Sequence, residues 1–220
     1  MNDMIEKKKS NYEKWCEEWR QKFLQMDLSD LKMRIPELID HGTSLSIRHF
    51  GKPYYIDKQT GIISASDSFE SVSSTIRLNI YTLLAYAKSY GHLQNQWVPF
   101  EQLKNARPFA PAFQKGNVQS FAQTFAGRMD HLEMAFEKLG GKKIPFSDIG
   151  YQIDAFSCIP MRFLFWDEDY EFPAQANILF DKSATDFIHV ESTVTIASVG
   201  IAMLTEAAGL MPSGSFFQVN

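Results

Sequence analysis

The chain contains little cysteine and no closely spaced cysteine pair. Its 220 residues include two cysteines, Cys16 and Cys158. Structural zinc sites and iron–sulfur clusters need several neighbouring thiolates, so the sequence excludes a metal or cluster site built from cysteine. No secretory apolar segment follows Met1 either, and we therefore expect a reduced, cytoplasmic protein.

Basic residues and long apolar runs are also scarce. The sequence has 22 Lys and Arg against 26 Asp and Glu, a net charge of −4. A general nucleic-acid binder needs a basic face to neutralise phosphates, so we expect no nucleic-acid partner. The apolar stretch from Ser192 to Thr205 is shorter than the about 20 residues that cross a bilayer. It predicts a buried helix and no membrane partner.

Established catalytic and nucleotide-binding motifs are missing. The chain has no HExxH, GxSxG, GxxxxGK[ST] or GxGxxG sequence, and its five histidines are scattered. Cys158 lies between apolar segments, where we expect a small buried side chain rather than a nucleophile. The sequence therefore names neither a reaction nor a cofactor.

Apolar periodicity predicts an α+β fold in a single globular domain, residues 1–220. An N-terminal helix from about residue 4 to 27 packs outside. Period-two segments predict two groups of three short strands, at 43–63 and 151–180, in one antiparallel sheet. Long helices near 72–90, 118–139 and 189–210 cover this sheet, with Asn117 as the N-cap of the second.

Each strand group is followed by a helix, which indicates an internal duplication. A shift of 118 residues aligns Phe69, Val72, Ser74, Thr75 and Gly91 with Phe187, Val190, Ser192, Thr193 and Gly209. Chance is the alternative, because two capped apolar helices share the same needs. A duplication requires the same strand order in both halves.

Two arginines and two aromatic residues are candidates for ligand binding. Arg107 and Phe109 lie in a stretch rich in proline and aromatic residues, 97–113, which we expect to form a loop or short turns and to line a pocket for an anionic aromatic ligand. The alternative is that this stretch packs over the sheet. Arg162 lies within a strand that ends at Trp166, so its buried charge requires a carboxylate, from Asp154 or from the acidic residues that follow.

Four carboxylates are concentrated in the run from Trp166 to Pro173. In an extended chain Asp167, Asp169 and Glu171 project to one side, where they suit a hard divalent cation. Their mutual repulsion predicts that some of their pKa values are raised. The run lacks the glycine and the final acid of an EF-hand loop. A solvated connection between strands and a protein-binding surface are the alternatives to a metal site.

The same run resembles an uncharacterised family of bacterial proteins, a domain of unknown function. The pattern that carries the resemblance is Trp166-x-Glu168-Asp169-x-Glu171-Phe172-Pro173-Ala174-x-Ala176-Asn177-Ile178-Leu179-Phe180-Asp181. The resemblance implies no reaction and no catalytic residues. Similar domains occur in anaerobes, sometimes joined to iron–sulfur modules of a kind met in corrinoid metabolism, although this chain lacks the cysteines for such a module.

Two classes of function follow from the sequence. The first is a non-enzymatic ligand-binding or accessory protein with a small-molecule or protein partner, linked to corrinoid or iron–sulfur metabolism by the resemblance. The second is a carboxylate-dependent or metal-dependent enzyme that acts on a small anionic substrate. Its metal ligands or general base come from Asp167, Asp169 and Glu171, and Arg107 or Arg162 holds the substrate. The sequence leaves the oligomeric state open.

Overall fold

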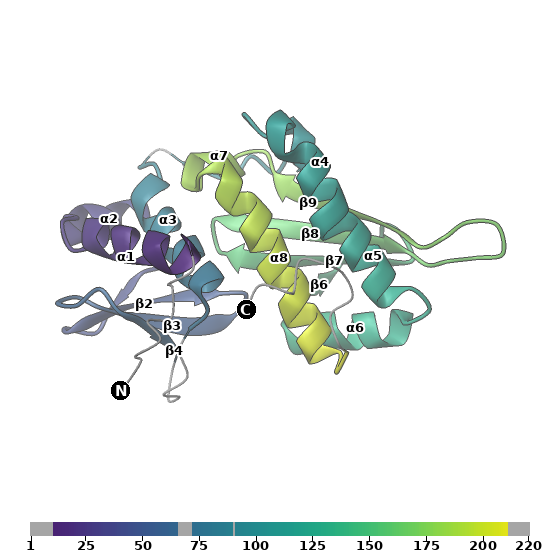
Figure 1. Ribbon diagram of the computed structural model, residues 1–220, viewed down its shortest axis with the longest axis horizontal. Helices are drawn as coiled ribbons and strands as arrows, with labels where there is room; N and C mark the ends of the chain where they lie inside the picture. Colours follow the sequence, from purple (N-terminus) through teal and green to yellow (C-terminus); the bar gives the residue numbers. More distant parts are fainter. Residues whose placement is uncertain (1–10, 66–71, 90, 211–220) are drawn as a thin grey trace, which may run out of the picture.

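A computed structural model describes residues 11–65, 72–89 and 91–210 (Figure 1). Its first half contains, in chain order, α1 (Asn11–Phe23), α2 (Leu28–Arg34), β1 (Ile39–Asp40), β2 (Ser44–His49), β3 (Lys52–Asp57), β4 (Ile63–Ala65) and α3 (Ser74–Tyr86). These strands form an antiparallel sheet in the order β1-β2-β3-β4. The predicted N-terminal helix therefore ends at Phe23, and α2 follows as a separate helix because Asp27 caps its start through the Ser29 amide, 2.8 Å away.

The second half begins with an edge strand, β5 (Trp97–Pro99). It continues with the 3₁₀ turns η1 (Phe100–Gln102) and η2 (Arg107–Phe109), α4 (Ala110–Phe113), the π-helical segment η3 (Gln114–Val118), α5 (Gln119–Phe125), α6 (Met129–Lys138), β6 (Lys142–Lys143), β7 (Ile149–Phe156), β8 (Ile159–Trp166), β9 (Gln175–Asp181), α7 (Ala184–Phe187) and α8 (Val190–Ala207). The strands form a second antiparallel sheet in the order β5-β9-β8-β7-β6.

The predicted α+β class and both three-strand groups are confirmed, and the groups belong to two sheets rather than one. The proline-rich stretch contains an element that the sequence did not predict. Trp97 to Pro99 pair with β9 at the sheet edge, where a proline removes no hydrogen bond from a central ladder.

The helix predicted over 118–139 is two helices, and Asn117 is not its N-cap. Gly127, with φ of +67°, ends α5 in the left-handed conformation that glycine adopts most readily. Asn117 is fully buried within η3, where its Oδ1 accepts a hydrogen bond of 2.8 Å from Ser198. The apolar stripe runs through the break, so periodicity alone did not reveal it.

The two halves repeat the same succession of elements, as a duplication requires. Two helices, a two-residue strand, a three-strand meander and a helix follow each other as α1-α2-β1-β2-β3-β4-α3 and, apart from the short helix α7, as α5-α6-β6-β7-β8-β9-α8. The helices α3 and α8 start from the N-caps Ser73 and His189, which are 116 residues apart rather than the 118 of the sequence alignment. Phe69 lies outside the described residues.

Equivalent positions of the two halves meet each other between the sheets. His49 and Phe156 each end a strand before a tight turn, and their rings stack at 4.4 Å between centroids. Asn79 and Thr195 each lie six residues after their helix's N-cap, and the Thr195 hydroxyl donates to Asn79 Oδ1 at 2.6 Å. Contacts between equivalent positions are the arrangement that a two-fold axis between the halves would produce.

The C-terminal helix α8 has the length and composition of a membrane span, the one such helix among the described residues. Ten of its residues are buried in the protein, and it contacts both α3 and α6. Packing between these elements accounts for its apolar composition, as the sequence predicted. The contiguous core on both sides of α8 includes Phe50, Phe163 and Phe180.

Candidate functional site

The acidic run forms the loop between β8 and β9, which projects from the body at the right of Figure 1. Two of its carboxylates bind the backbone of the loop and of its neighbours. Asp167 Oδ1 accepts from the amides of Gly127 and Glu168, at 2.8 and 2.9 Å. Asp169 Oδ1 accepts from the amides of Glu171 and Phe172, both at 2.8 Å. Two of the predicted metal ligands therefore shape the loop.

The pKa of Asp169 moves in the opposite direction to the prediction. Hydrogen bonds from the backbone amides of Phe172 and Glu171 lower it below its ordinary value, because they stabilise the ionised form. Over the described ranges, no three side chains of His, Cys, Asp or Glu come together in an arrangement that could hold a metal ion. The geometry therefore gives the predicted divalent-cation site no support.

Large apolar side chains of the same loop lie in solvent. Tyr170 is fully exposed, Phe172 is 59% exposed and Trp166 is 40% exposed. Phe146, on the adjoining β6–β7 connection, is 54% exposed. We call the residues from Trp166 to Pro173 the hairpin tip. Exposed aromatic residues gathered on one projection are a common mark of an interaction surface.

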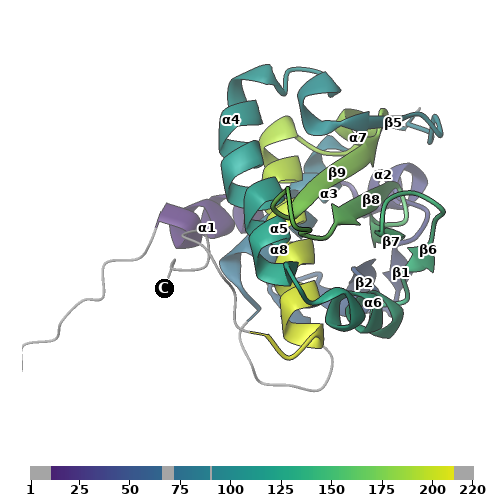
Figure 2. The ribbon, with the colours of Figure 1, turned by 90° about the vertical axis from the view of Figure 1, so that its right-hand side faces the viewer.

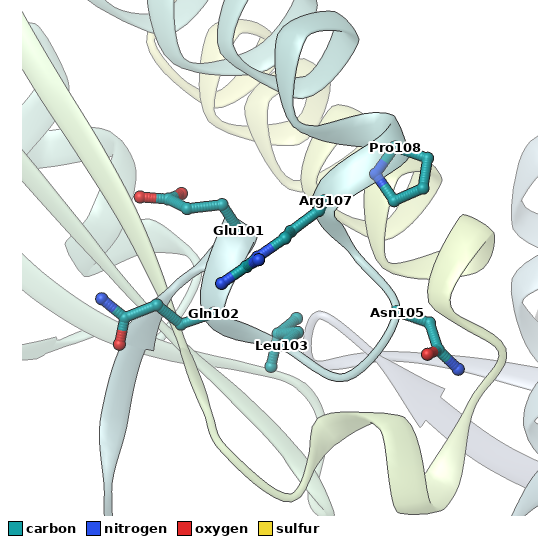
Figure 3. A pocket seen from close by; sticks show the side chains of 6 residues that line it. All are labelled: Glu101, Gln102, Leu103, Asn105, Arg107 and Pro108. Carbon is teal, nitrogen blue, oxygen red and sulfur yellow. The ribbon is translucent and has the colours of Figure 1, made fainter.

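Arg107 lines a cavity of about 550 Å³ together with Glu101, Gln102, Leu103, Asn105 and Pro108. Figure 3 shows its side chain running across this cavity toward Gln102. Most of these residues are exposed, so the cavity is a shallow depression formed by residues 101–108 alone. Phe109 does not line it and packs against the core instead. The hairpin tip contributes nothing to it, and the structure does not bring these two predicted regions together.

Arg162 is half-buried on β8, and its partner is not the predicted carboxylate. Its Nε donates to Gln152 Oε1 at 3.2 Å, and its Cζ lies 3.8 Å from the centroid of the Trp97 ring. Asp154, the expected partner, lies on the same strand as Gln152, and burial raises the pKa of its carboxyl while Lys142 opposes this. Burial lowers the pKa of Arg162. The stacked indole is a contact that spacing along the chain did not predict.

A buried polar chain that the sequence did not indicate joins the two halves. His49 is fully buried, and its Nδ1 donates to the Ala155 carbonyl at 2.8 Å, since a carbonyl only accepts. Its Nε2 then accepts from the Asn79 amide at 3.3 Å, and Asn79 accepts from Thr195. Burial lowers the pKa of His49 to about 4, so the ring is neutral. These hydrogen bonds link the first half of the fold to the second. None of the residues that form them lines the Arg107 cavity.

The comparisons with known proteins give one match. A family model described as a domain of unknown function, DUF3786, matches residues 7–203. The comparisons with curated proteins and with solved structures gave no match.

Proposed function

Because the chain belongs to this family of unknown function, its function has to be inferred from its own surface, and we propose that it is a non-enzymatic accessory protein that docks a partner protein through the hairpin tip. The observation that carries the proposal is the exposure of Trp166, Tyr170 and Phe172 on one projecting loop. Apolar side chains left in solvent lose contact with water only when a partner covers them, and that burial stabilises a complex.

The charge of the tip indicates the chemistry of the partner. Asp167, Glu168, Asp169 and Glu171 lie among the three aromatic residues, and the tip contains no basic residue. Carboxylates favour a partner surface that carries Lys or Arg, and the aromatic rings can also bind such cations through their faces. The partner surface that fits best is therefore basic and partly apolar.

The tip is also held in a fixed shape before any partner binds. Asp167 ties it to the α5–α6 turn through Gly127, and the Asp167 amide donates to Asp148 at 2.9 Å. Within the tip, the Asp169 amide donates to the Phe172 carbonyl at 3.0 Å. A loop that is already ordered loses less conformational entropy on binding, which raises its affinity.

A labelled peptide of alternating arginine and leucine tests the proposal. Its dissociation constant, measured by fluorescence anisotropy, should rise by about tenfold or more when Tyr170→Ser and Phe172→Ser are combined. The matched control combines Met33→Ser and Ile62→Ser, two exposed apolar residues far from the tip in the sequence, 72% and 56% exposed. Equal affinity for the wild type and the tip variant, or an equal loss in the control, would refute the proposal.

A photo-crosslinking experiment extends this test to the physiological partner. The crosslinking amino acid p-benzoylphenylalanine replaces Tyr170 in one variant and Ile62 in the other, and both are mixed with an extract of the source organism. We expect a crosslinked protein at position 170 alone, and its loss when Asp169→Asn and Glu171→Gln are added. Its identity would also test the link to corrinoid or iron–sulfur metabolism that the family resemblance implies.

The alternative, a carboxylate-dependent enzyme, receives less support from the geometry. Asp167 and Asp169 direct their bonded oxygens at backbone amides, and the tip lines no part of the Arg107 cavity. A general base has to reach a substrate proton, and a metal site needs converging ligands. The accessory role requires only the exposed aromatic and acidic side chains of the hairpin tip.

A further inference from the structure

The five-stranded sheet has one face covered by helices and one face open. In Figure 2, α4, α5 and α8 lie together on one side of this sheet. Along β8, Met161, Phe163 and Phe165 are fully buried toward the helices, and Leu164 on the other face is also buried, at 9% exposure. Arg162 projects from the opposite face, since neighbouring residues of a strand point to opposite sides. Antiparallel sheets commonly keep one face in solvent, so openness alone has no functional meaning.

Arg162 lies at the centre of this open face. The strand register places Lys142, Gln152, Arg162, Leu179 and Pro99 in one row across all five strands. Leu164 and Asn177 form the next row. The β6–β7 connection bounds the face beyond them, because it crosses Gly150 so closely that a Cβ there would lie 2.2 Å from the Phe146 carbonyl oxygen. We call this surface the Arg162 face.

Arg162 forms no ion pair with a carboxylate among the described residues. Among the described residues, the half-buried arginines are Arg20, Arg34, Arg77 and Arg162. The first three pair with Glu17, Asp30 and Glu13, at 2.6, 2.7 and 2.5 Å. Arg162 has the Trp97 ring and the Gln152 amide, and the described residues place no acceptor on its two terminal amino groups.

The donors of the Arg162 terminal amino groups are therefore available to a ligand from outside the chain. A guanidinium has five N–H donors, and Arg162 uses one of them on Gln152. The remaining N–H donors of the planar guanidinium suit a carboxylate, which arginine binds through two parallel hydrogen bonds. The Trp97 ring holds the guanidinium in place, which limits the side-chain entropy that binding would cost.

The strands around Arg162 lie side by side across the sheet, which suits an extended protein segment. Arg162 lines neither the Arg107 cavity nor a second cavity of about 270 Å³ between α3 and α8. Small molecules bind in concave sites that enclose most of their surface. An extended segment crossing the strands can contact the half-buried Trp97 and Leu179 while one of its carboxylates pairs with Arg162. Asp154 stands on the same face beside Lys142, so a segment with one acid at Arg162 fits better than a highly charged anion.

We propose that the Arg162 face is a second docking surface, which binds an acidic, partly apolar segment of a partner protein through a carboxylate–Arg162 pair. Its carboxylate-binding group, Arg162, lies outside the hairpin tip, whose chemistry suits a basic partner. The protein would then present two surfaces on one half of the fold, one that prefers a basic partner and one that prefers an acidic partner. An adaptor between two partners requires such a pair of surfaces.

Peptide binding to the full-length protein tests this inference. The probes are labelled peptides of alternating glutamate and leucine, and of alternating glutamine and leucine. We expect the glutamate peptide to bind the wild type, and Arg162→Gln to weaken it by about tenfold or more, the loss of one charge-assisted pair. Arg107→Gln, which removes an exposed arginine outside the face, should leave binding unchanged. Arg162→Lys should recover only part of it, because lysine lacks the fork.

Several outcomes would overturn the inference. They are equal binding of the two peptides, an equal loss in Arg107→Gln, and binding of free glutamate as tight as that of the peptide, which would indicate a small-molecule site. Trp97→Phe keeps an aromatic ring and serves as a second variant if Arg162→Gln does not fold. It should weaken the glutamate peptide, and an unchanged affinity would count against the proposal. The tip variant Tyr170→Ser should still bind this peptide, so failure here and failure of the tip proposal are distinguishable.

Discussion

Protonation of His49 should destabilise the protein as the pH falls, and the size of the effect follows from its burial. The pKa of His49 is lowered from 6.5 to about 4, first because burial disfavours the charged ring, and the hydrogen bond to Ala155 only partly opposes this. At 1.36 kcal/mol per pKa unit, this difference corresponds to about 3 kcal/mol. Since the folded pKa lies below the unfolded one, the unfolded chain binds the proton first. The full stabilisation is present above pH 6.5 and is lost as the pH falls toward 4.

Urea unfolding at pH 7.5 and at pH 4.5 measures this loss. Acidic groups also titrate toward low pH, so the comparison that matters is with His49→Gln, which cannot gain a charge. We expect the wild type to lose about 2 to 3 kcal/mol more than this variant between the two pH values. His41→Gln, at an exposed histidine, should keep the wild-type dependence. The same pH dependence in the wild type and in His49→Gln would show that His49 is not buried as a neutral ring.

Three further predictions concern packing, thiols and the hairpin tip. Gly200→Ala places a Cβ 2.8 Å from Phe50 Cζ, where α8 meets the first half. Thermal unfolding should show that the free energy of unfolding falls by about 1 to 3 kcal/mol. An unchanged stability would refute this close contact. Burial raises the pKa of both thiols, that of Cys16 to about 11 and that of Cys158 further. Ellman's reagent at pH 8 should therefore react at least about tenfold more slowly with the folded protein than in urea, and equal rates would contradict the described burial. Tyr170→Ser should change the free energy of unfolding by less than about 0.5 kcal/mol, and a larger loss in urea unfolding would mean that the tip is structural.

Local pattern predicted the elements that have clear periodicity. Both strand groups alternate with period two, and α3 and α8 have apolar faces, so their approximate positions followed from the sequence. The break between α5 and α6 did not, because the apolar stripe continues through Gly127 and only the backbone conformation there reveals the end of the helix. The edge strand β5 was missed for a related reason: its pairing with β9 is a contact across about 80 residues of chain.

The candidate site, too, was predicted from the sequence only in part. Composition alone located the hairpin tip, since four acids and three aromatic residues in eight positions have few ways to be buried. It did not show that Asp167 and Asp169 bind backbone amides rather than a cation. In the tertiary structure Arg162 contacts Trp97 rather than the expected carboxylate. The Arg107 cavity contains no residue of the hairpin tip.

By itself, the sequence determined the class of fold, the family, and the absence of known catalytic motifs, because these depend on residue types and their spacing along the chain. Only the tertiary structure decided which side chains meet. His49 stacks on Phe156, Thr195 bonds to Asn79, and Arg162 lies over Trp97. Each of these contacts joins residues far apart in the chain. Such contacts depend on how the two halves pack together, and no local pattern encodes the partner of a buried or half-buried polar group.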